Sequence, residues 1–342
     1  MRAAVPVRFL QQRVRARPAR RDSSNRAREA AAAPLPPRRF GGNNCKATMS
    51  ATYSIAPAPG PRLRLMVIDY DDTLCPSSWI AAAPERQATE NDLAILQHVE
   101  ESIAGLLRQA DALGCSVVII TNADEEWVKF SSRRFLPRVV PLLARVRVVS
   151  ARHYEALYPG RSVCWKAAAF THVAKAFFAA AEDELAAAEA CAAAAAGRPA
   201  PPRRPPPPRE IISVGDSNDE RLAVRAAARP LDATPKAIKL VDAPSLHTIA
   251  CQLHTVATCL PFVAHGDFPI DVDVAAILAY VGAAHRDGPV HDVLQRVWRD
   301  AAWGVLTAIR FQGNEANATL DDAPPPPDGS PSSPAPNVVA AA

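Results

Sequence analysis

The sequence VIDYDDTL, residues 67–74, places three carboxylates within four positions directly behind an apolar run. Asp69, Asp71 and Asp72 carry like charges that repel one another, and burial of a carboxylate is costly when it has no partner. A hard cation, most simply Mg²⁺, would relieve this repulsion, because magnesium takes oxygen ligands and keeps room for water and a phosphate. The alternative interpretation is a solvated polar loop.

Other polar side chains follow other apolar segments of the chain. Thr121 and Asn122 come after CSVVII, Lys166 opens a helical pattern, and Asp216 follows EIISV. Active residues of a parallel α/β sheet gather where its strands end. We therefore expect these side chains to surround one crevice with Asp69 and Asp71. The carboxylates would hold Mg²⁺ there, and the Thr121 hydroxyl and Lys166 would hold phosphoryl oxygens.

Alternating strand and helix patterns predict the elements that position these residues. The Glu90–Leu113 segment has apolar residues at steps of three and four, a capping box at Thr89 and Asp92, and Gly114 as C-terminal cap. Further helices are predicted from Asn122 to Val140, broken at Pro137, and from Lys166 onward. Together they indicate an α/β fold with a mostly parallel five-stranded sheet and helices on both faces. The predicted strands are RLRLMVID, CSVVII, Val146–Ser150, Glu210–Val214 and Ala237–Val241.

Four of these features together resemble the motifs of the haloacid dehalogenase-like (HAD) superfamily. Asp69-Tyr70-Asp71-Asp72-Thr73 matches D-x-D-x-T after an apolar strand, and Thr121, Lys166 and the Gly215-Asp216 pair follow in the expected order. The likeness covers roughly residues 63–245. Within the superfamily, IDYDDTL, ITNADEEWVKFSSRRFLP and SVGDSNDER are similar to a little-characterised group of algal and protist members. The resemblance implies a Rossmann-like core.

The resemblance also implies roles for individual residues. Asp69 would be the nucleophile that forms an aspartyl-phosphate, and Asp71 the general acid and base. Thr121 and Lys166 would bind the phosphoryl group. Asn122 is a further candidate phosphate contact, with a helix cap as its other role. Mg²⁺ would be held by Asp69, the Asp71 carbonyl and Asp216. The aspartate at position 71 favours a phosphatase or phosphomutase over a dehalogenase or P-type ATPase.

Two assignments within these motifs have alternatives. The fourth motif usually has a second acid four residues after the first, which makes Glu220 the auxiliary metal residue, whereas Asp219 lies at three. Lys166 is preferred over Lys175 because it opens a helix after a loop, and Arg161 is a weaker substitute.

The intervals between the motifs bear on the substrate. Only 49 residues separate Asp71 from Thr121, and 44 separate Thr121 from Lys166, so neither interval holds a separate cap domain. An open site is typical in this superfamily of a large substrate such as a phosphoprotein. We thus expect a Mg²⁺-dependent phosphatase acting on a phosphomonoester. The other hypothesis is a non-catalytic protein of the same fold that binds phosphorylated partners.

Composition divides the chain into regions. Residues 1–60 are predicted to be a disordered leader, 61–265 the HAD-like domain with a low-complexity insertion at 183–209, 266–320 a C-terminal helical segment (helical over 268–312), and 321–342 a disordered tail. Eleven Arg and one Lys against two acids in residues 1–46 are typical of an organelle transit peptide, although a true start at Met49 stays open. The remaining chain is net negative, which argues against nucleic acid as a partner.

Cysteine usage and hydropathy bear on location. Seven cysteines without a CxxC pair favour a reducing compartment, hence an intracellular protein of the cytoplasm, plastid or mitochondrion. Absence of a run of eighteen apolar residues predicts no membrane partner. Trp79 and Trp127 are candidates for a substrate surface or for the core. Arg133 and Arg134 are candidates for attracting a phosphorylated partner, although a solvated helix face is favoured.

Overall fold

The strand nearest the first motif shows why the chain forms three layers. The computed structural model describes residues 62–83, 87–199, 202, 205–278, 304–309 and 312. In β1 (Leu63–Ile68), Leu65 and Val67 face one hydrophobic cluster, and Met66 and Ile68 face the other. A strand that is apolar on both sides needs cover on both faces, as in parallel sheets flanked by helices.

The sheet has six strands in the order β3-β2-β1-β4-β5-β6, and every neighbouring pair is parallel. This is the strand order of a Rossmann-like doubly wound sheet, in which the chain changes direction between β1 and β4. Ligands of such sheets bind outside the carboxyl ends of the strands at that point. The strands are β2 (Cys115–Thr121), β3 (Arg147–Ser150), β4 (Arg209–Gly215), β5 (Ala233–Lys239) and β6 (Ile270–Asp273).

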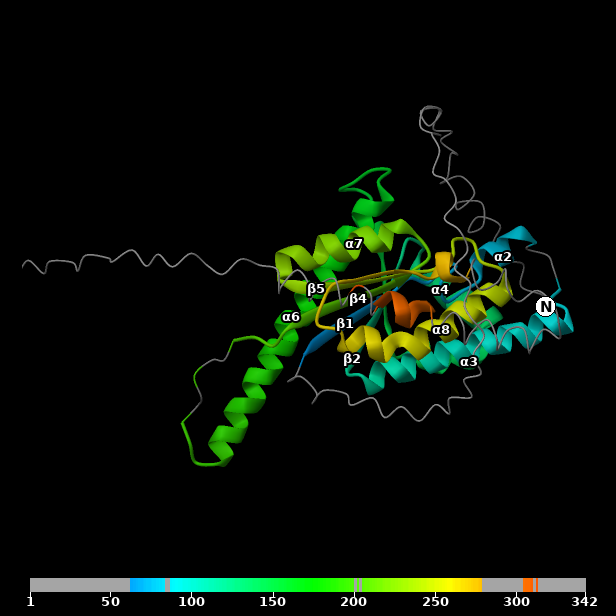
Figure 1. Cartoon of the computed structure of the whole chain (residues 1–342). Helices are drawn as coiled ribbons and strands as arrows, with labels where there is room; N and C mark the ends of the chain where they lie inside the picture. The colour runs from blue at the N-terminus through cyan, green and yellow to red at the C-terminus, as the bar shows by residue number, and fades with distance from the viewer. Residues whose placement is uncertain are drawn as a thin grey trace, which may run out of the picture.

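Helices cover both faces of the sheet, as predicted (Figure 1). α3 (Glu90–Ala112) and α8 (Leu246–His265) pack together on one face, and α6 (Ser162–Ala195) and α7 (Asn218–Ala228) pack together on the other. The face of α3 and α8 also receives α4 (Glu125–Phe135). Shorter helical elements are α2 (Ser77–Ala82), η1 (Pro137–Val139), α5 (Val140–Leu143), η2 (Ala151–Tyr154) and η3 (Arg229–Leu231).

The residues predicted to cap the two ends of α3 do so in the structure. The Asp92 amide donates to the Thr89 hydroxyl at 3.1 Å, and the Thr89 amide donates to the Asp92 carboxylate at 2.9 Å, which is a capping box. Gly114 follows the helix with φ 67°, the left-handed conformation that favours glycine. In place of the helix predicted over 122–140, α4 ends before Leu136, and η1 begins at Pro137 and continues directly into α5.

The predicted number of five strands was wrong, because β6 adds a sixth within the segment 268–312 predicted to be helical. Its four residues are held by long-range contacts. Arg221 and Arg225 of α7 pair with the Asp271 carboxylate, and the Gln312 side chain binds the Asp271 amide and carbonyl at 3.1 and 2.7 Å. Such contacts leave no periodic pattern in a short sequence. Of the other described residues there, 274–278 and 304–309 are helical.

Two other predicted regions differ in extent. α6 continues to Ala195, so the first half of the low-complexity segment 183–209 is helix, extending away from the sheet in Figure 1. β5 begins four residues earlier than predicted. The leader at 1–60 and the tail at 321–342 lie outside the described residues, so those predictions stay predictions.

Among the described residues, α8 is the one helix whose length and apolar composition would allow it to cross a membrane, and 61% of its most apolar window is buried in the fold. Its N-cap is Ser245, whose hydroxyl accepts from the Thr248 amide at 3.2 Å. The buried side of the helix includes Cys251, Val256 and Cys259.

Because the Cys259 thiol is buried, we expect the protein to lose stability at alkaline pH. Burial raises the pKa of the thiol from 9.0 to about 12. Above pH 9 the unfolded chain therefore binds fewer protons than the folded one, and the free energy of unfolding falls as pH rises toward 12. This thiol contributes at most about 1.4 kcal/mol per pH unit. Urea denaturation between about pH 9 and 10.5 should show that the free energy of unfolding declines less steeply with pH in Cys259→Ala than in wild type. Cys191→Ala, at an exposed position, is the control. Equal slopes for Cys259→Ala and wild type would contradict the prediction.

Candidate active site

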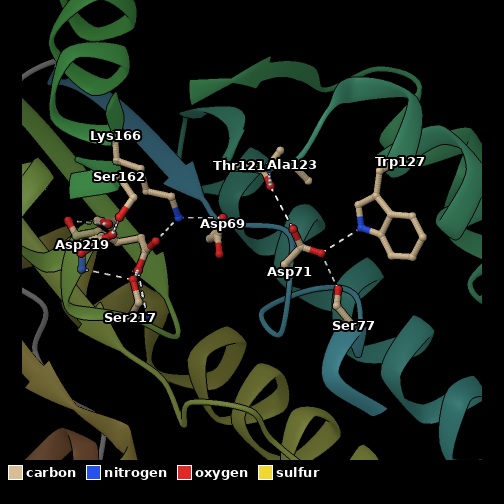
Figure 2. Close-up of polar contacts among 12 residues, drawn as sticks. Asp69, Asp71, Ser77, Thr121, Ala123, Trp127, Ser162, Lys166, Ser217 and Asp219 are labelled. Atoms are coloured by element: carbon tan, nitrogen blue, oxygen red, sulfur yellow. Dashed lines mark hydrogen bonds and ion pairs between the residues drawn. The ribbon is translucent and has the colours of Figure 1, made fainter. Parts of the chain in front are cut away.

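The loop after β1 turns tightly at the carboxyl edge of the sheet. The Asp69 amide donates to the Val214 carbonyl at 2.9 Å, which extends the pairing of β1 with β4. The Leu74 and Cys75 amides both donate to the Tyr70 carbonyl, at 2.9 and 2.8 Å. This turn buries Asp69 and directs its carboxylate away from that of Asp71 (Figure 2). Separation of the two carboxylates reduces the repulsion that the sequence implies.

Tyr70 anchors this loop to α4. Its side chain is fully buried, and its hydroxyl lies 2.7 Å from the Ser131 hydroxyl and 3.3 Å from the Val128 carbonyl. Burial raises the pKa of the Tyr70 hydroxyl well above its ordinary value, so the group stays neutral. The second residue of the D-x-D pattern is thus a packing residue that fixes the aspartates on either side.

The Asp71 carboxylate is held by donors from three separate elements. The Thr121 hydroxyl at the end of β2 donates to Oδ2 at 3.2 Å, and the Trp127 indole Nε1 of α4 donates to Oδ1 at 2.8 Å. Ser77, the first residue of α2, also donates to Oδ1. Figure 2 shows the carboxylate enclosed between these three side chains. Three donors to one carboxylate fix its orientation.

Asp69 lies beside the predicted lysine. Lys166 Nζ is 2.9 Å from Asp69 Oδ1, and both side chains are buried. Lys166 reaches the edge of the sheet from the second turn of α6, which begins at Ser162. The structure thus places Lys166 next to Asp69, whereas Lys175 is exposed farther along the same helix.

Glu220 binds the other side of Lys166. Its Oε1 forms an ion pair with Lys166 Nζ, and its Oε2 accepts from the Ser217 amide at 2.9 Å as part of the capping box of α7. The side chain passes directly over Gly215, where an added Cβ would come within 2.4 Å of Glu220 Cγ. A side chain at position 215 would therefore displace Glu220.

Several predicted residues have other contacts. Asp216 is buried directly after β4, and Asp219 accepts from the Ser162 hydroxyl at 2.9 Å. Asp72 accepts from the Ser78 amide and hydroxyl, at 2.7 and 2.6 Å, and holds the start of α2.

Asn122 follows Thr121, and its buried Oδ1 has no hydrogen-bond partner among the described residues. That oxygen is an acceptor, so a phosphate would have to contact the amide nitrogen instead.

The oxygen donors at the strand ends suit a hard cation in type. Within the described part of the chain, no group of three or more His, Cys, Asp or Glu side chains is arranged to hold a metal ion. The predicted ligand set is smaller, with two carboxylates and the Asp71 carbonyl, and magnesium completes such a set with water and phosphate oxygens. Asp69 and Asp216 follow β1 and β4, which are neighbours, so the set is plausible in chemistry and position. Both carboxylate oxygens of Glu220 are occupied by protein donors, so its predicted metal role stays a prediction.

Trp127 and Ser77 were not predicted as partners of Asp71. The sequence allowed Trp127 a place either on a substrate surface or in the core, and the structure buries it. No local pattern indicates this contact, because the donor lies 56 positions after the acceptor in the sequence. Ser77 is only six residues from Asp71, but many hydroxyls lie this close to an acid without contact.

Trp127→Phe tests the contact of the indole with Asp71. The ring can keep its packing beside Phe130, whose centroid is 6.1 Å away, but it loses the donor to a buried carboxylate. The free energy of unfolding should fall by about 2 kcal/mol in urea denaturation. Trp165→Phe is the control, because its indole donates to the exposed Tyr158 carbonyl, and its effect should stay below roughly 0.5 kcal/mol. Similar losses in the two variants would contradict a special role for Trp127.

The arrangement brings together a carboxylate beside a buried ammonium group and a second carboxylate held by three donors. The first is suited to nucleophilic attack, and the second to proton transfer. In the described residues of the intervals between Asp71, Thr121 and Lys166, the structure has helices and β3 and no separate folded unit. No protein-family model, no curated protein and no solved structure matches this chain.

Proposed function

We propose that this protein is a Mg²⁺-dependent phosphatase with a HAD-like core, which hydrolyses a phosphomonoester through an aspartyl-phosphate on Asp69. The observation that carries the proposal is the buried pair of Asp69 and Lys166, 2.9 Å apart, at the carboxyl edge of a parallel sheet. The second carboxylate, Asp71, lies two residues away and is oriented by Thr121 and Trp127. The Asp71 carboxylate and the Lys166 ammonium flank the residue that would react.

The chemistry would proceed in two steps. In the first, an Asp69 carboxylate oxygen attacks phosphorus, the bond from phosphorus to the ester oxygen breaks, and the leaving oxygen takes a proton from Asp71. In the second, the Asp71 carboxylate takes a proton from water, whose oxygen attacks phosphorus and releases inorganic phosphate and free Asp69. The donors from Thr121, Trp127 and Ser77 would hold the Asp71 side chain in place for both proton transfers.

Lys166 would serve both steps by electrostatics. Its ammonium group is close enough to Asp69 to contact a phosphoryl oxygen carried by that residue, where negative charge spreads during transfer. Glu220 fixes Lys166 from the other side. Mg²⁺, held by Asp69, Asp216 and the Asp71 carbonyl, would neutralise phosphoryl charge when bound.

The substrate class is proposed from the open edge of the sheet. The described intervals between the motifs have no separate unit that would enclose a small molecule. A phosphorylated protein, whose phosphate projects from a larger surface, would fit such an edge. The protein would act inside the cell, in the cytoplasm or, if the basic leader directs import, in a plastid or mitochondrion.

Hydrolysis of para-nitrophenyl phosphate by the full chain tests the metal requirement. Turnover should appear with millimolar-range Mg²⁺, disappear with excess chelator, and return when Mg²⁺ is restored, because the carboxylates at the site are themselves negative and Lys166 alone cannot offset both their charge and that of the phosphoryl group. The ester is small and needs no specific docking surface. Turnover that persists unchanged in chelator would exclude a Mg²⁺-dependent phosphatase.

A second candidate is a non-catalytic protein that binds phosphorylated partners. It is favoured by the contacts of Asp71 and Glu220, since a carboxylate held by several protein donors can be purely structural. Thermal stabilisation by Mg²⁺ with beryllium fluoride separates the candidates, because this phosphate mimic binds at an accessible nucleophilic carboxylate. Absence of turnover together with absence of this stabilisation would favour the binding protein.

A further inference from the structure

A concave site lies between α2, the first half of α3, and the segment from the end of α4 to η1. Its volume is about 560 Å³. Pockets that bind small molecules or cofactors typically have roughly 300–1,000 Å³. None of the aspartates, the threonine or the lysine of the candidate active site lines this pocket. It is therefore a separate cavity that the proposed reaction does not use.

The walls of the pocket are largely apolar. Trp79 and Ile80 come from α2, Leu93 and Leu96 from α3, and Phe135 from the end of α4. Leu93 is 50% exposed, although it lines a concavity where an apolar ligand could cover it. Covering such surfaces is favourable by about 25 cal/mol per Å². The walls thus suit the apolar body of a ligand.

The charged side chains of the pocket are Arg134, Arg138 and Glu100. Glu100 is buried, accepts from the Arg138 amide at 2.6 Å, and belongs to the wall. Arg138 has one long contact with exposed Glu101, at 3.5 Å, which is a weak surface pair. Arg134 is exposed, and its guanidinium lies 5.5 Å from the centre of the Phe135 ring. The two guanidinium groups therefore give the lining a positive excess.

From this combination we propose that the pocket binds a small amphipathic anion, a free molecule with an apolar, flat or aliphatic body and one carboxylate or sulfonate group. The apolar body would contact Trp79, Leu93 and Phe135, and the anionic group would pair with Arg134 or Arg138. Planar guanidinium groups match carboxylate oxygens in a two-pronged geometry. The amides of Gln87 and Gln97, also in the lining, supply further donors.

The pocket shares α2 with the candidate active site. Trp79 and Ile80 line the pocket, whereas Ser77 and Ser78 of the same short helix donate to Asp71 and Asp72. A ligand would therefore contact the helix that fixes the acidic loop. The binding proposal itself does not depend on the proposed phosphatase activity, and it is tested by binding alone.

Titration of the full chain with 8-anilinonaphthalene-1-sulfonate tests the proposal, because this probe has an aromatic body and one sulfonate. A saturable increase in probe fluorescence is expected. Leu93→Glu should weaken binding by at least roughly tenfold, because it places a negative charge in the apolar wall, and Arg134→Gln should weaken it by about fivefold. Matched controls are Leu222→Glu, which is also 50% exposed but lies on α7, and Arg133→Gln, which is exposed next to Arg134 but outside the lining.

The charge of the ligand is tested by displacement. Naphthalene-2-carboxylate should displace the probe, whereas the uncharged naphthalene-2-carboxamide should need an at least roughly tenfold higher concentration for the same displacement. If circular dichroism shows that Leu93→Glu does not fold, the proposal is tested by comparing the probe affinity of Arg134→Gln with that of Arg133→Gln. The proposal is overturned if the pocket variants bind the probe like wild type, if the controls lose binding equally, or if the amide competes as well as the acid.

Discussion

Asp69→Asn is expected to abolish hydrolysis of para-nitrophenyl phosphate, with a loss of at least about three orders of magnitude in kcat. An amide oxygen is a poor nucleophile, and it cannot carry the phosphoryl group as a mixed anhydride. The fold should persist, because Lys166 keeps its ion pair with Glu220 and the amide can still accept a hydrogen bond. Initial rates under saturating Mg²⁺, with circular dichroism as a check of folding, measure the effect.

Asp72→Asn is the matched control. Asp72 lies in the same acidic loop and has φ 57°, a backbone conformation that asparagine also tolerates. Its carboxylate accepts from Ser78, and an asparagine can keep one of these two bonds. Its kcat should therefore stay within roughly tenfold of wild type. If Asp69→Asn keeps activity comparable to Asp72→Asn, Asp69 is not the nucleophile.

A binding assay on the same two variants separates loss of chemistry from loss of the site. Wild type and Asp72→Asn should gain thermal stability with Mg²⁺ and beryllium fluoride, because the mimic bonds to an Asp69 carboxylate oxygen beside Lys166. Asp69→Asn should show no gain from adding the mimic to Mg²⁺. A full gain in Asp69→Asn would place the phosphate mimic at another residue and would contradict the proposed intermediate.

The sequence predicted best those elements that are specified by local chemistry. The apolar run of β1, the Thr89 and Asp92 capping box, and the turn at Gly114 each depend on residues a few positions apart. The parallel sheet followed from the alternation of such elements. The short strand β6 was missed because Arg221, Arg225 and Gln312, which hold Asp271 there, are distant in sequence.

The candidate site likewise contains contacts that could be predicted from the sequence and contacts that could not. Proximity of Asp69 and Lys166 could be predicted, because both follow from where strands and helices end in a parallel sheet. The contact of Trp127 with Asp71 could not, since it depends on how α4 packs against the loop. The position of Glu220 could have been predicted from the sequence. Ser217 and Glu220 have the spacing of a capping box, which directs the glutamate back toward the start of α7.

Lys166→Met is expected to lower the free energy of unfolding by about 3–5 kcal/mol. The lysine is the ion-pair partner of both Asp69 and Glu220, and all three side chains are buried. Methionine has a similar length but no charge, so the two carboxylates would remain buried without this cation, which costs more than the pair contributed. Urea denaturation should show a lower midpoint with an unchanged slope. Phosphatase turnover should be lost in the same variant.

Two further variants test whether the loss comes from uncompensated charge. Lys175→Met, at an exposed position of the same helix, should change stability by no more than about 0.5 kcal/mol. Adding Glu220→Gln to Lys166→Met should recover part of the loss, because glutamine can keep the cap of α7 while removing one of the two buried charges. No recovery in the double variant would mean that methionine acts through packing and that Lys166 does not balance Glu220. Recovery of stability without recovery of turnover would separate the structural role of the ammonium group from its role beside Asp69.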